Sequence, residues 1–224
     1  MSSTSPTSPY QSLLLRLLHG AMALLTLLAI ASGFWVYNTY DGRWGSLPLP
    51  KPYYTQDLHG TGALALFLLM FPFALYCFHL GDRRLWSDQN WEQLQKPGTP
   101  AFWVAWQKLV NTLMLVALTM AVVSGRMMQE SWLPQKELNH LPYFFHLLGW
   151  LIVVLCLAFH LLFSAKVGGI ALWRSMVSWG RRAKDNPQQW LWDFRWKLSS
   201  KSLQWLRWLV LAGLVFALIM PAFA

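Results

Sequence analysis

The chain has 224 residues, of which 55% are hydrophobic and only 12% are charged. A soluble domain usually carries about twice that charged fraction, so the composition favours an integral membrane protein. Fifteen tryptophans agree with this class, because tryptophan gathers where membrane helices meet the headgroups. The net charge of +9 would by itself fit a nucleic-acid-binding protein, but the placement of the basic residues explains it as membrane topology.

Five apolar runs of membrane-spanning length follow one another along the chain. They cover residues 13–37, 59–79, 104–124, 142–164 and 205–223. Backbone groups in lipid must be hydrogen-bonded within their own segment, so we expect each run to be a helix. The sequence therefore predicts an all-α integral membrane protein, with a four-helix bundle over residues 13–164 and a fifth transmembrane helix over 205–224. Residues 1–12 form a tail that lacks the basic region of a signal peptide.

The basic residues predict the orientation. If the N-terminus is cytoplasmic, fourteen of the eighteen lysines and arginines lie inside, and the outer side keeps only Arg43, Lys51, Arg126 and Lys136. This asymmetry matches the positive-inside rule. Residues 165–204 then form a basic, tryptophan-rich cytoplasmic segment, which we expect on the lipid bilayer surface rather than on nucleic acid.

The run 142–164 carries two histidines, His146 and His160, and no acid or base. Their fourteen-residue separation corresponds to roughly 21 Å along a helix. The same step falls about 40° short of four full turns, so both imidazoles lie on nearly one side of the helix. One imidazole near each membrane face suggests two stacked ligand sites.

Two more histidines match these depths in the predicted topology. His19 lies near the inner end of the first run, level with His160, and His59 lies at the outer end of the second run, level with His146. A single histidine near a helix end is equally well explained as a hydrogen-bonded boundary residue. Two depth-matched pairs instead predict axial ligands of haem iron, two neutral imidazoles for each of two b haems. We expect His79 and His140 to be boundary or loop residues.

Other residues near the four histidines have two interpretations each. Arg16 and Arg126 can pair with haem propionates, or they can be ordinary boundary residues. Small residues adjoin the histidines, either to admit a flat macrocycle or to allow close helix packing. These are Gly20, Gly60, Gly62 and Gly149.

Several functions lack their usual residues. All nine acidic residues fall outside the apolar runs, whereas a proton pump or cation transporter is expected to bury a carboxylate. The chain has no dinucleotide-binding fingerprint and no CxxCH, which excludes covalently attached c-type haem. Electrons would therefore enter and leave through protein partners or diffusible molecules.

The segments RLLHG, LHG, FFHLLGW and LAFHLLFS resemble the bacterial cytochrome b561 proteins and the b-type cytochrome subunits of nickel–iron hydrogenases. The resemblance covers residues 13–164. In it, run 104–124, the third along the chain, is the one member of the four-helix core that carries no ligand. It implies a four-helix core in the prokaryotic cytoplasmic membrane, two b haems, and quinone as a redox partner.

We therefore expect a dihaem cytochrome that moves electrons between a redox partner and quinone. It would be either the membrane subunit of a soluble or membrane-bound oxidoreductase or a stand-alone superoxide:quinone oxidoreductase, in which the outer bases steer the anion. A third alternative is a haem-free protein whose histidines bind a transition metal.

Overall fold

The computed structural model describes residues 11–129, 140–178, 180, 185, 198 and 200–223, and within these residues every regular element is helical. The elements are α1 (Leu13–Tyr40), α2 (Thr55–Leu80), η1 (Gly81–Arg83), α3 (Asn90–Leu94), α4 (Pro100–Met127), α5 (Leu141–Val177), α6 (Lys201–Ile219) and η3 (Met220–Phe223). The predicted all-α class is confirmed.

Five helices, α1, α2, α4, α5 and α6, are each long and apolar enough to cross a membrane. Helices α1, α2, α4 and α5 contain the first four predicted runs, and α6 with η3 covers the fifth. Most of them continue beyond the predicted bounds, because a polar cap rather than the edge of the apolar run can decide where a helix begins. At α4, for example, the Thr99 hydroxyl accepts a hydrogen bond from the Phe102 amide at 3.3 Å, and Pro100 takes the first helical position.

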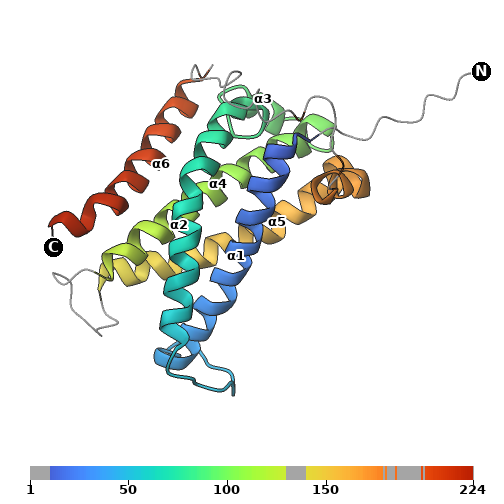
Figure 1. The fold of residues 1–224 in the computed structure, drawn as a ribbon. Helices are drawn as coiled ribbons and strands as arrows, with labels where there is room; N and C mark the ends of the chain where they lie inside the picture. The colour runs from blue at the N-terminus through green and yellow to red at the C-terminus, as the bar shows by residue number, and fades with distance from the viewer. Residues whose placement is uncertain are drawn as a thin grey trace, which may run out of the picture.

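The core consists of two helical hairpins (Figure 1). Helix α1 packs along α2, and α4 packs along α5, while contacts between the two hairpins are sparser. We call the end that contains Arg16 the inner end and the end that contains the α1–α2 connection the outer end. A bundle of this kind can hold cofactors between its hairpins.

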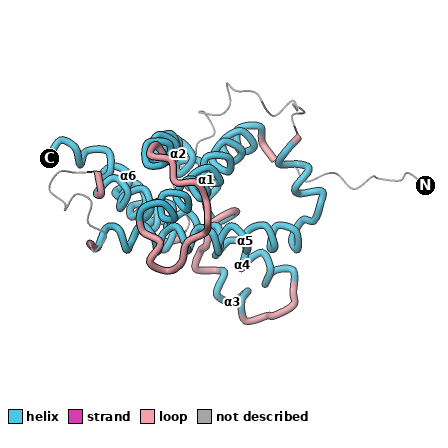
Figure 2. Tube along the Cα trace, turned by 90° about the horizontal axis from the view of Figure 1, so that it is seen from below, coloured by secondary structure: helices cyan, strands magenta, loops and turns pink. Residues whose placement is uncertain are grey.

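Helix α6 packs against α2 and α4 and so belongs to the bundle. Its side chains Leu203, Val210 and Leu214 are fully buried. Gly213 permits this close approach, since a Cβ there would lie 3.0 Å from Thr119 Cγ2. Figures 1 and 2 both place α6 on the side of the bundle opposite the C-terminal end of α5.

Helix α5 extends thirteen residues past the predicted end at Ser164 and bends on the way. The bend is at Gly169, whose φ of 56° and ψ of −157° suit glycine and strain other residues. The segment 165–204 therefore begins as a helix. Most of its remainder lies outside the described residues, and so do nearly all of its tryptophans and basic residues after Arg174.

Candidate functional site: two histidine pairs

The inner pair joins α1 to α5. The ring centroids of His19 and His160 lie 6.0 Å apart, and the ring planes are inclined by 33°. Helices α1 and α5 contact each other little, so the two rings meet across the boundary between the hairpins.

The outer pair joins α2 to α5. The centroids of His59 and His146 are also 6.0 Å apart, but their planes are inclined by 78°. The structure thus brings together the same two pairs that depth along the sequence suggests. Their role as axial ligands stays a prediction.

Hydrogen bonds fix the ring tautomer of the outer histidines. His146 Nδ1 lies 2.9 Å from the Ala121 carbonyl oxygen, which can only accept, so Nδ1 carries the proton. The Ser32 hydroxyl donates to the Leu28 carbonyl at 2.7 Å and is therefore free to accept from His59 Nδ1 at 3.0 Å. In both rings Nε2 is left with its lone pair, which is the state a metal ligand needs.

His160 is held in the same tautomer. Its Nδ1 lies 2.8 Å from Asn111 Oδ1. Asn111 Nδ2 donates to the Arg84 carbonyl at 3.0 Å, which fixes the amide orientation. In the described part of the chain, no hydrogen bond fixes the ring of His19.

Two glycines that sequence reasoning missed lie directly against the outer rings. A Cβ on Gly33 would approach His59 Cε1 to 3.1 Å, and a Cβ on Gly125 would approach His146 Cε1 to 3.1 Å. Their spacing in the sequence could have indicated them. Gly33 follows His19, and Gly125 follows Asn111, by the same fourteen residues that separate the two histidines of α5.

The four glycines singled out from the sequence have different surroundings. Gly149 packs against α4, where a Cβ would lie 3.2 Å from Ala121 Cβ, and Gly62 faces the Leu28 side chain at 3.1 Å. These two serve close helix packing. At Gly20 and Gly60 a Cβ would meet nothing within 4 Å, so both positions leave room beside the histidines.

A cavity of about 1320 Å³ surrounds the outer pair. It exceeds the roughly 300–1,000 Å³ usual for small-molecule sites, so it can admit a large cofactor. Both rings line it, together with Gly33, Gly60 and Arg126.

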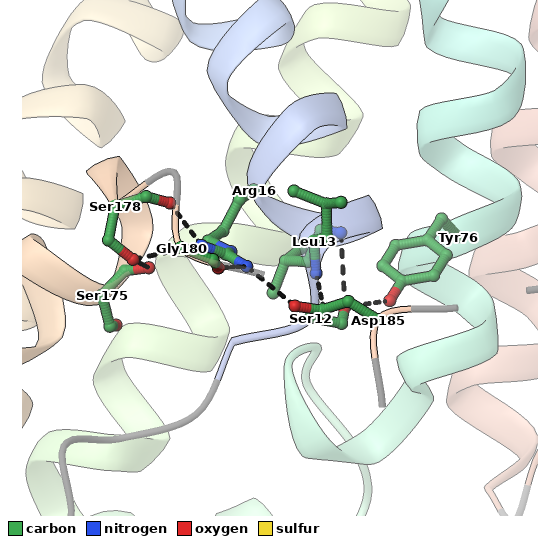
Figure 3. A network of polar contacts seen from close by, with 9 residues as sticks. Ser12, Leu13, Arg16, Tyr76, Ser175, Ser178, Gly180 and Asp185 are labelled. Atoms are coloured by element: carbon green, nitrogen blue, oxygen red, sulfur yellow. Dashed lines mark hydrogen bonds and ion pairs between the residues drawn. The ribbon is translucent and has the colours of Figure 1, made fainter. Parts of the chain in front are cut away.

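Arg16 lies one turn before His19 and is engaged with the segment that follows α5 (Figure 3). Its guanidinium pairs with Asp185 at 3.1 Å and donates to the carbonyls of Ser178 and Gly180. Asp185 also accepts from the Leu13 amide at 2.9 Å, at the start of α1. Arg16 Nε is buried and has no partner in the described residues, so it retains one donor for an acceptor such as a carboxylate.

The remaining candidates lie nearer the ends of the bundle. Arg126 lines the outer cavity, and its Nη1 donates to Gln129. His140 caps α5 by accepting from the Tyr143 amide at 3.2 Å. The ring of His79 lies 5.5 Å from that of Tyr76, at the inner end of α2.

The residues present fit an iron-centred cofactor. An imidazole nitrogen binds a transition metal at about 2.0 Å, so two rings that face one ion have centroids about 6 Å apart, as both pairs do. Among the described residues no three His, Cys, Asp or Glu side chains gather, so each site offers two protein ligands. Two ligands suit a macrocycle that brings its own nitrogens better than a bare zinc or copper ion.

Comparisons with curated proteins and with solved structures found no match. The family profile described as prokaryotic cytochrome b561 matches residues 10–179, which include all six histidines and the whole of helices α1 to α5. The chain therefore belongs to the prokaryotic cytochrome b561 family, the haem b-containing membrane cytochromes that carry electrons.

Proposed function

We propose that this protein is a dihaem cytochrome that transfers electrons across the prokaryotic cytoplasmic membrane between a redox partner and quinone. His19 and His160 would hold the inner haem, and His59 and His146 the outer haem. The N-terminus would lie in the cytoplasm, as the distribution of lysine and arginine favours.

One observation carries the proposal: both pairs have a centroid spacing of 6.0 Å, which fits a metal ion bound between two imidazoles. Three of the four rings also hold their proton on Nδ1, so Nε2 is available on both sides of the outer site and on one side of the inner site. A hydrogen bond from Nδ1–H to an oxygen is the usual support of a metal-bound histidine.

The haem, when bound, supplies one-electron redox chemistry. The chain contributes ligands, orientation and insulation from water. Two imidazoles at each site leave no coordination position for a substrate, which favours electron transfer over oxygen binding. Because α5 provides one ligand to each site, it fixes the two sites relative to each other, roughly 21 Å apart along its axis.

The arginines would serve the carboxylates of the cofactors. Arg16 Nε supports such a role at the inner end, because it is a buried donor without a partner in the described residues. Arg126 supports it at the outer end, since it lines the cavity that holds the outer pair. Quinone would bind beside one haem at the membrane boundary.

The test is a reduced-minus-oxidised visible spectrum of the purified full-length protein, with haem quantified per chain. We expect sharp low-spin b-type bands and two haems per chain. One haem per chain would mean that one pair is structural. Haem-free protein that binds stoichiometric zinc or copper would overturn the proposal in favour of a metal-binding function.

A further inference from the structure

Two neighbouring polar residues, Asn111 and Thr112, interrupt the apolar sequence of α4 and face the loop that follows α2. Asn111 Nδ2 donates to the Arg84 carbonyl at 3.0 Å, and the Thr112 hydroxyl accepts from the Trp86 amide at 2.9 Å. Between these two contacts Leu85 is buried in the hydrophobic core, with 2% of its surface exposed. The loop is thus anchored at three consecutive positions, two of which bond directly to α4.

The Asn111 contact continues to the inner histidine. Because the Arg84 carbonyl can only accept, the amide nitrogen of Asn111 must face it, and the amide oxygen faces His160 Nδ1 at 2.8 Å. A carbonyl-type oxygen opposite Nδ1 requires a proton there. The main chain of the loop therefore determines, through one side chain, which nitrogen of His160 has a free lone pair.

We propose that Asn111 is a positioning residue for His160, and that it couples the ligand field of the inner haem to the loop Gly81–Trp86. This deepens the proposed function and rests on it. A hydrogen bond from Nδ1–H to an oxygen raises the electron-donating strength of the imidazole. A stronger donor favours ferric over ferrous iron, so Asn111 lowers the reduction potential of the inner haem.

The supports of the outer pair that the described residues show are different. Ser32 and the Ala121 carbonyl both lie within transmembrane helices, and neither contacts the loop Gly81–Trp86 in the described part of the chain.

The experiment compares Asn111→Leu with Thr112→Val in the purified full-length protein, by redox titration of both haems and by haem retention during dilution. Leucine removes the acceptor for His160, so we expect a higher inner potential and inner haem binding weaker by roughly 10–100-fold, with the outer haem unchanged. Valine at position 112 removes the bond from the Trp86 amide and the bond to the Lys108 carbonyl within α4, but no contact with His160. It is the matched control and should leave both potentials unchanged.

Unchanged potentials in Asn111→Leu would overturn the inference, and so would an equal shift in Thr112→Val, because the effect would then be general loosening of the loop. If Asn111→Leu does not accumulate, Asn111→Asp replaces it, since it keeps an acceptor and adds negative charge. A lower inner potential in that variant supports the inference, and an unchanged or higher one overturns it. Wild-type protein without an inner haem would instead overturn the proposed function.

Discussion

The inner and outer histidine pairs have the same centroid spacing, but their ring planes are inclined differently and different groups hold the rings. The inner rings are inclined by 33° and the outer rings by 78°. Groups within transmembrane helices hold both outer rings, whereas His160 of the inner pair is linked through Asn111 to the loop that follows α2. Under the proposed ligand assignment, equal spacing with unequal support lets the two haem sites be tuned independently, the outer one by helix packing and the inner one by the loop that follows α2.

Removing one histidine from each pair should change the protein most. We expect His160→Ala to lose the inner haem and His59→Ala to lose the outer haem, each leaving about one haem per chain by pyridine haemochrome assay, since each variant would lack one of the two protein ligands of that haem. Retention of both haems in His160→Ala would refute the ligand assignment.

The same two variants separate the sites spectroscopically. Near-perpendicular imidazole planes leave the iron d orbitals close in energy and make the ferric low-spin electron paramagnetic resonance signal more anisotropic than near-parallel planes do. The more anisotropic signal of the wild type should disappear in His59→Ala and persist in His160→Ala.

The buried ion pair at the inner end gives the next largest effect. Asp185→Asn leaves the Arg16 cation without its counter-charge, and removal of one partner of a buried pair costs about 3–5 kcal/mol. We expect earlier thermal loss of the inner haem than of the outer haem. Asp88→Asn, at an exposed acidic residue of the same end, is the control and should melt like the wild type.

At the outer pair, packing can be disturbed without changing charge. Gly125→Val places a Cβ 3.1 Å from His146 Cε1 and should displace the ring, with weakening of outer haem binding of roughly 10–100-fold. Gly20→Val, next to His19 of the inner pair and with nothing within 4 Å of its Cβ, is the control and should leave the outer haem in place. Equal loss of the outer haem in both variants would mean that the contact with His146 is not the cause.

The smallest expected effect is a pH dependence of the outer end. Burial raises the pKa of the Asp41 carboxyl, but hydrogen bonds from Arg43 and Tyr143 outweigh burial and bring the pKa below its usual 3.8. A lowered folded-state pKa stabilises the protein above the unfolded pKa, and this contribution disappears as the pH falls through the folded value. Below about pH 4 the wild type should lose stability more steeply than Asp41→Asn, as followed by tryptophan fluorescence during acid titration. Parallel curves would show that Asp41 contributes nothing.

The sequence was sufficient for the helices and for the depth of each histidine, because apolar length and the count of basic residues depend on position along the chain alone. It was not sufficient for the groups behind the rings. Neither the role of Asn111 nor that of Gly33 could be predicted from the sequence, since both depend on how each helix is rotated about its axis. The ligand-free helix α4 in fact supplies Asn111, the Ala121 carbonyl and Gly125 to the histidines of α5.

The burial of Asp185 could not be predicted from the sequence either. All acids lie outside the apolar runs, yet this one is buried, with 4% of its surface exposed. Its environment arises because the chain after α5 returns to the start of α1, where Asp185 contacts Leu13 and Arg16. No local sequence pattern predicts such a return.

That return has a consequence for the order in which the protein is completed. The Leu13 amide at the start of the first helix is capped by a residue 172 positions later in the chain. At a synthesis rate of about 5–20 residues per second, the ribosome needs roughly ten to thirty seconds to reach Asp185 after it has made Leu13. Helix α1 is therefore synthesised well before its N-terminal turn can be completed, because the capping carboxylate belongs to the chain that follows α5.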